Sequence, residues 1–165
     1  MTRERWFAIG LLLVLVACVP DELDQPTSGD GWRLIGWARG GETGPPAVGE
    51  DAQQFLAALG LERMSAAVEP TNRETEVDVV VTHAVSGSCS QVRFDGFSAR
   101  EEERIMEAQI TDREDLFGLF ADACSADANP VVYWLAVERS VMPDGPFELR
   151  TDEAPSVITD VDLND

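Results

Sequence analysis

The chain has 165 residues, 44% of them apolar, which suits a single globular domain and excludes an intrinsically disordered protein. Its 31 acidic residues outnumber 12 basic residues, all of them Arg, and give a formal net charge of -19. Such a surface repels phosphate backbones and anionic headgroups, which argues against nucleic-acid binding and electrostatic docking on a membrane. Two explanations stay open: a solubilising surface, or a landing site for cations or a basic partner.

The first residues follow the three-part plan of an export signal. Arg3 and Arg5 make the start positive, Trp6 to Val19 is an apolar run, and Pro20 ends it before an acidic stretch. The run is shorter than the roughly 20 apolar residues of a spanning helix. It is apolar all round, whereas a core helix shows an amphipathic period. The pattern therefore predicts a signal peptide.

The run ends in Leu15-Val16-Ala17-Cys18, which resembles the lipobox of bacterial lipoproteins. The resemblance implies transfer of a diacylglyceryl group to the Cys18 thiol and cleavage before Cys18, so that residues 1–17 are a lipoprotein signal peptide. Two or more acyl chains, palmitate for example, anchor a protein stably. We therefore expect a protein anchored on the extracytoplasmic face of the cell membrane. The alternatives are ordinary cleavage after Ala17, which prefers a small residue at position 15, and an uncleaved anchor.

After the leader we predict a tether and one domain. Residues 18–31 hold Pro, Gly and acids and indicate a flexible tether. The domain covers residues 32–150 and begins with a strand over Trp32 to Ala38, followed by a loop over residues 39–49.

A helix is predicted to begin at Glu50 and Asp51, because acids in a first turn interact favourably with the helix dipole. Gly60 suits its end. Its buried face is formed by three apolar residues at helical spacing: Phe55, Leu56 and Leu59.

Four strands are predicted beyond the helix. Glu76 to Ala84 is apolar on both faces, which indicates a central strand. Gln91 to Phe97 has one apolar face, and Val131 to Glu138 is apolar on both faces. Phe147 to Arg150 follows a Pro-Asp-Gly-Pro turn and is expected to pair as a short edge strand. The acidic tail, residues 151–165, is expected to fray.

The segment between these strands is ambiguous. Arg100 to Ile110 is rich in helix formers, and Ser98 with Glu101 makes a capping box. Its place between two strands favours a hairpin arm instead, so we predict a strand over Arg104 to Ile110. Thr111 and Glu114 form a second capping box, which predicts a short helix ending near Cys124.

Cys89 and Cys124 remain once Cys18 is lipidated. An even pair of cysteines in an exported chain predicts a disulfide, worth about 3.8 kcal/mol in the chain-entropy model. The alternatives are a redox pair, usually spaced C-x-x-C, and a metal pair. Zinc needs about four ligands, whereas His83 is the only His.

Two resemblances bear on the fold. The Ser86-Gly87-Ser88-Cys89 turn, with Cys124-Ser125-Ala126-Asp127 before Pro130, resembles a pattern in small secreted or lipid-anchored proteins of high-GC Gram-positive bacteria. It implies a fold and a disulfide but no chemistry. Residues 51–138 are similar in element order to the accessory-subunit domain of a bacterial secreted protease complex. The chain departs from that pattern, with one Gly and a Cys where the pattern has two Gly and an aromatic residue. This second resemblance implies a β-rich interaction module.

No predicted active site emerges from the remaining polar residues. His83 is in phase with the valines of its strand, so we interpret it as packed or hydrogen-bonded and not as a general base. The run Glu101 to Glu103 is interpreted as a solvated face, because consecutive acids point in different directions. Asp160, Asp162 and Asp165 lack the Gly and distal Glu of a calcium loop. Four aromatic residues are assigned to the core by default: Trp32, Trp37, Tyr133 and Trp134.

The sequence thus predicts an α+β fold with a mainly antiparallel β-sheet, one or two short helices, one disulfide and no cofactor or metal. The predicted function is that of a lipid-anchored envelope protein that binds a protein or small ligand without catalysis. The alternatives are an envelope hydrolase and a regulator of an exported protease. An enzyme is expected to show a cleft with two or more converging ionisable groups. A binding module is expected to show an apolar patch or an unpaired sheet edge.

Overall fold

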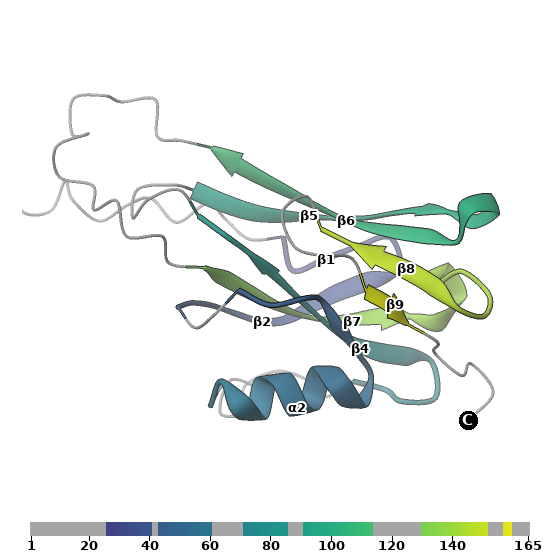
Figure 1. Cartoon of the computed structure of the whole chain (residues 1–165), viewed down its shortest axis with the longest axis horizontal. Coiled ribbons are helices and arrows are strands. Elements are labelled where there is room, and N and C mark those ends of the chain that lie inside the picture. Colours follow the sequence, from purple (N-terminus) through teal and green to yellow (C-terminus); the bar gives the residue numbers. More distant parts are fainter. Residues whose placement is uncertain are drawn as a thin grey trace, which may run out of the picture.

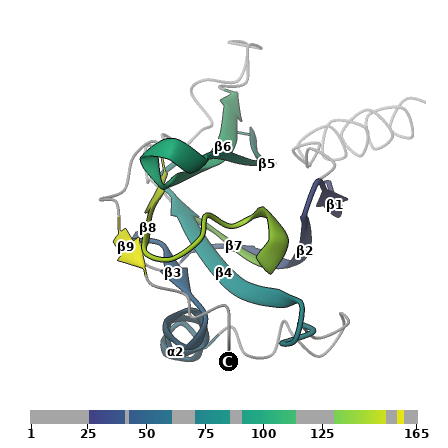
Figure 2. The same cartoon turned by 90° about the vertical axis from the view of Figure 1, so that its right-hand side faces the viewer.

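The computed structural model describes residues 26–40, 43–60, 71–85, 91–113, 130–151 and 157–159. They form two β-sheets and one α-helix, arranged in three layers (Figure 1). Figure 2 shows the helix on one side of the first sheet and the second sheet on the other. The mainly antiparallel pairing with a helix confirms the α+β class.

The first sheet, sheet A, has its strands in the order β1-β2-β7-β4-β3, and every neighbouring pair is antiparallel. The predicted strands β2, β4 and β7 are confirmed to within one residue at each end, whereas β1 and β3 are short edge strands that we did not predict. The strands of sheet A are β1 (Ser28–Gly29), β2 (Trp32–Arg39), β3 (Ala47–Val48), β4 (Glu76–His83) and β7 (Val131–Glu138).

The second sheet, sheet B, has the order β5-β6-β8-β9. β5 and β6 form an antiparallel hairpin closed by a 3-10 turn at Glu101–Glu103. β8 pairs parallel to β6 and antiparallel to β9. The strand predicted over Arg104 to Ile110 is therefore confirmed. The strands of sheet B are β5 (Gln91–Arg100), β6 (Ile105–Arg113), β8 (Phe147–Arg150) and β9 (Val157–Thr159).

Three expectations about sheet B are wrong. Thr111 does not cap a helix: it lies within β6, because pairing with β5 continues to Gln91 and Arg113, and its hydroxyl donates to the Asp95 carboxylate. β8 is not an edge strand, since it lies between β6 and β9. The tail does not fray throughout, since β9 pairs with β8. The helix predicted after Thr111 lies outside the described residues.

The main core lies between the two sheets. Phe94 of β5 contacts residues of sheet A, with its ring centroid 4.7 Å from that of Trp32 and 5.7 Å from that of Tyr133. Phe94 and Tyr133 are at most 1% exposed. The alternating valines of β4 and β7 fill the rest of this layer. The default assignment of Trp32 and Tyr133 to the core is thus confirmed.

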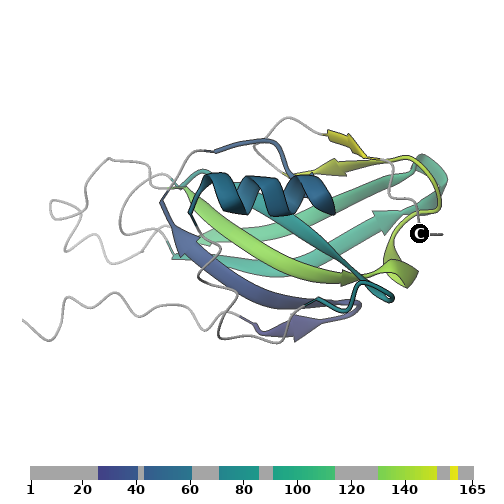
Figure 3. The same ribbon diagram turned by 90° about the horizontal axis from the view of Figure 1, so that it is seen from below.

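The helix α2 (Glu50–Ala58) covers the outer face of sheet A, the face turned away from sheet B (Figure 3). Ala52 and Leu56 pack against Val80 and Val132, with Trp134 half-buried beside them. The helix begins after Gly49, whose positive φ of 62° turns the chain at a position where other residues are strained. This packing confirms Leu56 as the centre of the predicted helix face.

Candidate functional site

A groove lies where the edges of the two sheets meet the helix. β3 ends sheet A and β9 ends sheet B, and Figure 2 shows these two strands side by side above α2. The groove has a volume of about 570 Å³ and is open to solvent. Polar and apolar atoms contribute about equally to its exposed surface. The apolar residues of its lining are Pro45, Pro46, Ala47, Val48, Phe55, Val157 and Ile158, and the polar ones are Asp51, Gln54 and Thr159.

The wall formed by the helix depends on the sequence before it. Consecutive prolines at positions 45 and 46 favour an extended backbone that leads into β3. Gly49 then turns the chain into α2, and its N–H donates to the Asp78 carbonyl oxygen at 2.7 Å. Asp51 consequently lies in the first turn of α2, where its carboxylate meets the positive end of the helix dipole.

The opposite wall carries the most exposed apolar side chain among the described residues. Ile158 is 79% exposed. It pairs with Glu148 of β8, whereas its neighbours Val157 and Thr159 pair with the buried residues Leu149 and Phe147. Since successive side chains of a strand alternate between faces, Ile158 points to the solvent side of sheet B. A single exposed apolar residue is common on protein surfaces, so Ile158 is informative only as one of several apolar residues that line the groove.

A buried carboxylate ties the helix to sheet A. Asp78 is 5% exposed, and its oxygens accept hydrogen bonds from Trp134 Nε1 at 2.9 Å and Gln53 Nε2 at 3.0 Å. The Thr71 hydroxyl donates to it as well. Three donors from the sheet, the helix and the preceding loop thus compensate the burial of one charge. The arrangement is a structural link and not an open site.

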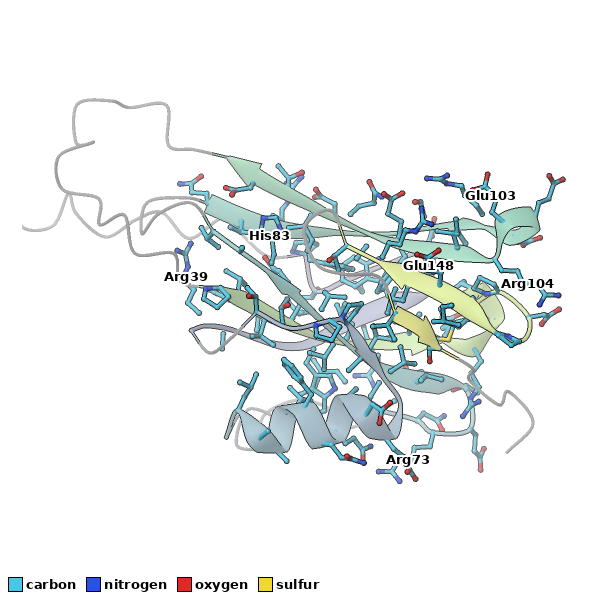
Figure 4. The ribbon with its side chains drawn as sticks, viewed as in Figure 1. Arg39, Arg73, His83, Glu103, Arg104 and Glu148 are labelled. Carbon is cyan, nitrogen blue, oxygen red and sulfur yellow. The ribbon has the colours of Figure 1, made fainter. Side chains whose placement is uncertain are left out.

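A second carboxylate on the same face forms an ion pair across β7. Arg33 donates to Glu76 through Nε at 2.9 Å and Nη2 at 2.8 Å, a bidentate geometry. This hydrogen bonding lowers the pKa of Glu76 below 4.5, against the opposing effect of burial, and the Asn72 N–H lowers it further. Arg73 lies nearby on the α2 side of sheet A (Figure 4).

His83 forms the second candidate site, at the end of β4 (Figure 4). It is 4% exposed, as expected for a packed histidine. Its Nε2 lies 3.8 Å from the Asp112 carboxylate on β6, so the pair joins sheet A to sheet B. The two groups form an ion pair only if His83 is protonated, and the distance exceeds that of a hydrogen bond. The serines at positions 86, 88 and 90 lie outside the described residues.

The other predicted site residues lie either in the turn between β5 and β6 or outside the described residues. Glu101 to Glu103 form an exposed turn at the end of the β5–β6 hairpin, as expected of a solvated run. The described residues contain no cluster of three potential metal ligands. Cys18, Cys89 and Cys124 lie outside them, so the lipid anchor and the disulfide stay predictions. The same holds for the three aspartates of the tail.

Sequence reasoning missed the groove itself. Its walls come from residues 45–55 and 157–159, which are far apart in the chain, and only the tertiary fold brings them together. One local signal was available: Val157-Ile158-Thr159 is a run of three β-branched residues in an otherwise acidic tail.

No family model, curated protein or solved structure matches the chain. Within the described ranges, none of the helical structure has the length and hydropathy that crossing a bilayer requires. The groove and the His83–Asp112 pair therefore have to be interpreted from their own chemistry.

Proposed function

We propose that the protein is an exported lipoprotein, held on the extracytoplasmic face of the cell membrane by acyl chains on Cys18, whose domain binds a partner without catalysis. The groove between α2, β3 and β9 is the binding site in this proposal. The lipobox supports the location, and the groove supports the activity. The predicted tether gives the domain reach above the membrane surface. It is shorter than residues 18–31, because Ser28–Gly29 pair with β2 as strand β1.

One observation carries the binding role: an open groove of mixed polarity whose lining includes an isoleucine that is 79% exposed. Single exposed apolar side chains are common on soluble domains, so Ile158 points to a contact surface only together with the other apolar residues of the groove. β9 adds to this, because it is the last strand of sheet B in the described part of the chain and the edge of a sheet is a template for another chain. Both features were the expected marks of a binding module.

The chemistry of the groove favours binding over catalysis. Asp51 is the one ionisable side chain among the described residues that line it. Acid–base catalysis requires groups that converge on one reacting atom, commonly two of them with different protonation states. A surface that combines apolar and polar groups instead provides affinity through burial of the apolar groups and orientation through the polar ones.

The binding role is tested by photo-crosslinking in cells. A photoreactive phenylalanine is placed at Ile158, and at Ser98, an exposed residue of β5, as the matched control. We expect a discrete crosslinked product from position 158 that is absent from position 98. Equal labelling from both positions, or none from either, contradicts the proposal. A peptidase in the product would identify the partner as an exported protease, the regulatory role implied by the resemblance.

The anchor is tested by the intact mass of the membrane-extracted protein, measured with and without reductant. We expect a chain that begins at Cys18, carries acyl chains, and gains the mass of two hydrogens on reduction. The variant Cys18→Ala should leave the membrane fraction or retain its leader. A mature chain with an unmodified Cys18 contradicts the lipoprotein assignment.

The His83–Asp112 pair favours a second candidate, an envelope hydrolase. A histidine beside a carboxylate is a common arrangement of a general base, although at 3.8 Å the Asp112 carboxylate does not hydrogen-bond to His83 Nε2. The variants His83→Gln and Asp112→Asn test it against ester and peptide substrates. Hydrolysis that both substitutions abolish would support the enzyme, whereas hydrolysis absent from the unmodified protein or unchanged in both variants would support the binding module.

A further inference from the structure

We propose that the groove takes an extended, basic peptide segment of a partner protein, which adds as a strand to the open edge of β9. This inference rests on the binding role proposed above and specifies the partner's chemistry. It combines the pairing of β9, the exposure of Ile158 and the charge at Asp51.

The first observation is the edge of β9 that faces away from β8. Within the described part of the chain, β9 pairs with β8 on one side and is the last strand of sheet B. An extended segment laid along the other side forms main-chain hydrogen bonds with it, the mode of recognition called β-augmentation. The proximity of β3, the last strand of sheet A, gives such a segment a second wall.

The apolar residues of the lining determine which side chains the bound peptide segment is expected to carry. In an extended segment every second side chain points the same way. Val157 and Ile158 point to opposite faces of β9, so the alternate apolar residues would pack beside Val157 and Phe55 on the inner face. The residues between them would lie on the solvent face beside Ile158, where the aliphatic stems of Arg or Lys can cover it. An open groove suits this occupant better than a small molecule, because small-molecule sites usually enclose most of their ligand.

The negative charge of the protein determines which class of partner is favoured. Asp51 lies in the groove wall next to Glu50, and the whole chain carries a formal charge of -19. A second copy of this chain would meet strong like-charge repulsion at the edge, as would nucleic acid or an anionic membrane. A segment with Arg or Lys at its solvent-facing positions is attracted instead. The helix dipole offsets part of the charge on Asp51, so its own share of the attraction is modest.

The test uses the full chain in a neutral detergent and three synthetic peptides. The first alternates Val and Arg, the second alternates Val and Glu, and the third is the Val–Arg peptide with N-methyl groups that remove backbone donors along one edge. We expect binding of the first peptide only, measured by calorimetry, and weaker binding as salt is raised. Binding of the Val–Glu peptide with equal affinity, or of the N-methylated peptide, overturns the inference.

Two variants locate the site on the protein. Val157→Ser should weaken binding of the Val–Arg peptide by about tenfold or more, because it removes an apolar contact on the face where the Val residues pack, without adding charge. Asp51→Asn should weaken it about two- to threefold. Glu102→Gln removes one exposed acid from the distant hairpin turn and should leave the affinity unchanged. Equal losses of affinity in Asp51→Asn and Glu102→Gln would mean that the net charge of the protein, and not Asp51 in the groove, attracts the peptide. That result would overturn the proposed binding site.

The crosslinking experiment separates this inference from the function on which it depends. A crosslink from Ile158 to a protein, with no binding of the Val–Arg peptide, overturns strand addition and leaves the binding role standing. A crosslink to a small molecule does the same. Thermal unfolding of each variant at the temperature of the unmodified protein confirms that loss of binding is not loss of fold.

Discussion

Sheet A and sheet B bury their side chains in different ways. Seven of the eight residues of β4 are buried in sheet A, and β7 is buried on both faces as well. β5 of sheet B alternates between buried and solvent-facing residues, and its last three residues are exposed. The cause is that α2 covers the outer face of sheet A, whereas the outer face of sheet B meets solvent in the described part of the chain.

Charged side chains therefore have different surroundings on the two outer faces. On sheet A, Asp78 is buried and held by neutral donors from three segments. On sheet B, charged residues form ion pairs at the surface, such as Arg93 with Asp95 and Arg100 with Glu103. Water screens a surface pair, so its net contribution is small. Loss of a buried, hydrogen-bonded carboxylate instead leaves donors without partners. Replacing an aspartate should thus lower the free energy of unfolding strongly on sheet A and weakly on sheet B.

The largest effect is expected where both sheets share one side chain. Phe94→Ala removes a ring that contacts Trp32 and Tyr133 across the layer. It should lower the free energy of unfolding by about 3 to 5 kcal/mol, the usual cost of deleting a buried aromatic ring. Urea denaturation measures the change. Phe94→Leu keeps most of the volume and should cost about 1 kcal/mol. Similar losses in the two variants would argue against dense packing between the sheets.

The comparison of the outer faces is tested by a matched pair of aspartates. Asp78→Ala leaves Trp134 Nε1 and Gln53 Nε2 without their acceptor beneath α2, and should lower the free energy of unfolding by about 2 to 3 kcal/mol. Asp95→Ala removes an acceptor of Arg93 and Thr111 on sheet B and should cost about 0.5 kcal/mol. Equal costs would show that burial under the helix does not distinguish the two faces.

The same difference explains what the sequence could predict about the sheets. The valines of β4 and β7 appear on both strand faces, which correctly placed these strands in the centre of a covered sheet. Val92 and Phe94 alternate with polar residues, which correctly gave β5 one solvent face. Hydrophobic periodicity records which faces are buried, so this part of the fold is readable locally.

Pairing partners and the groove could not be read in this way. Thr111 has the local signature of a helix cap, but cross-strand pairing with β5 outweighs it. The four residues of β8 do not specify an interior position or a parallel neighbour, since their alternation would be the same at an edge. Ile158 forms part of a groove only because the fold places it near Phe55, a residue distant from it in the sequence. Such information lies in contacts between distant segments.

The smallest effect sharpens the comparison at the rim of sheet A, where the Arg33–Glu76 pair lies between burial and exposure. The two side chains are 26% and 16% exposed. Because the pair holds the pKa of Glu76 below 4.5, the ionised carboxylate stabilises the fold above that pH. This stabilisation is lost as the pH falls through the folded-state pKa. Glu76→Gln should therefore lower the free energy of unfolding near neutral pH by about 1 kcal/mol or less, with a difference from the unmodified protein that shrinks below pH 4.5.

The control for this pH dependence is Glu103→Gln, which breaks the more exposed pair with Arg100 on sheet B. Water already solvates both of these side chains, so stability should change little at any pH. Chemical denaturation of the three proteins across the acidic range measures the two differences. A pH-independent effect of Glu76→Gln would mean that the side chain stabilises the rim through packing and not through its charge. An equal pH-dependent effect in both variants would mean that net charge, and not the bidentate contact with Arg33, governs the response. Only a response confined to Glu76 fits a pair that the edge of the helix-covered sheet shields in part from solvent.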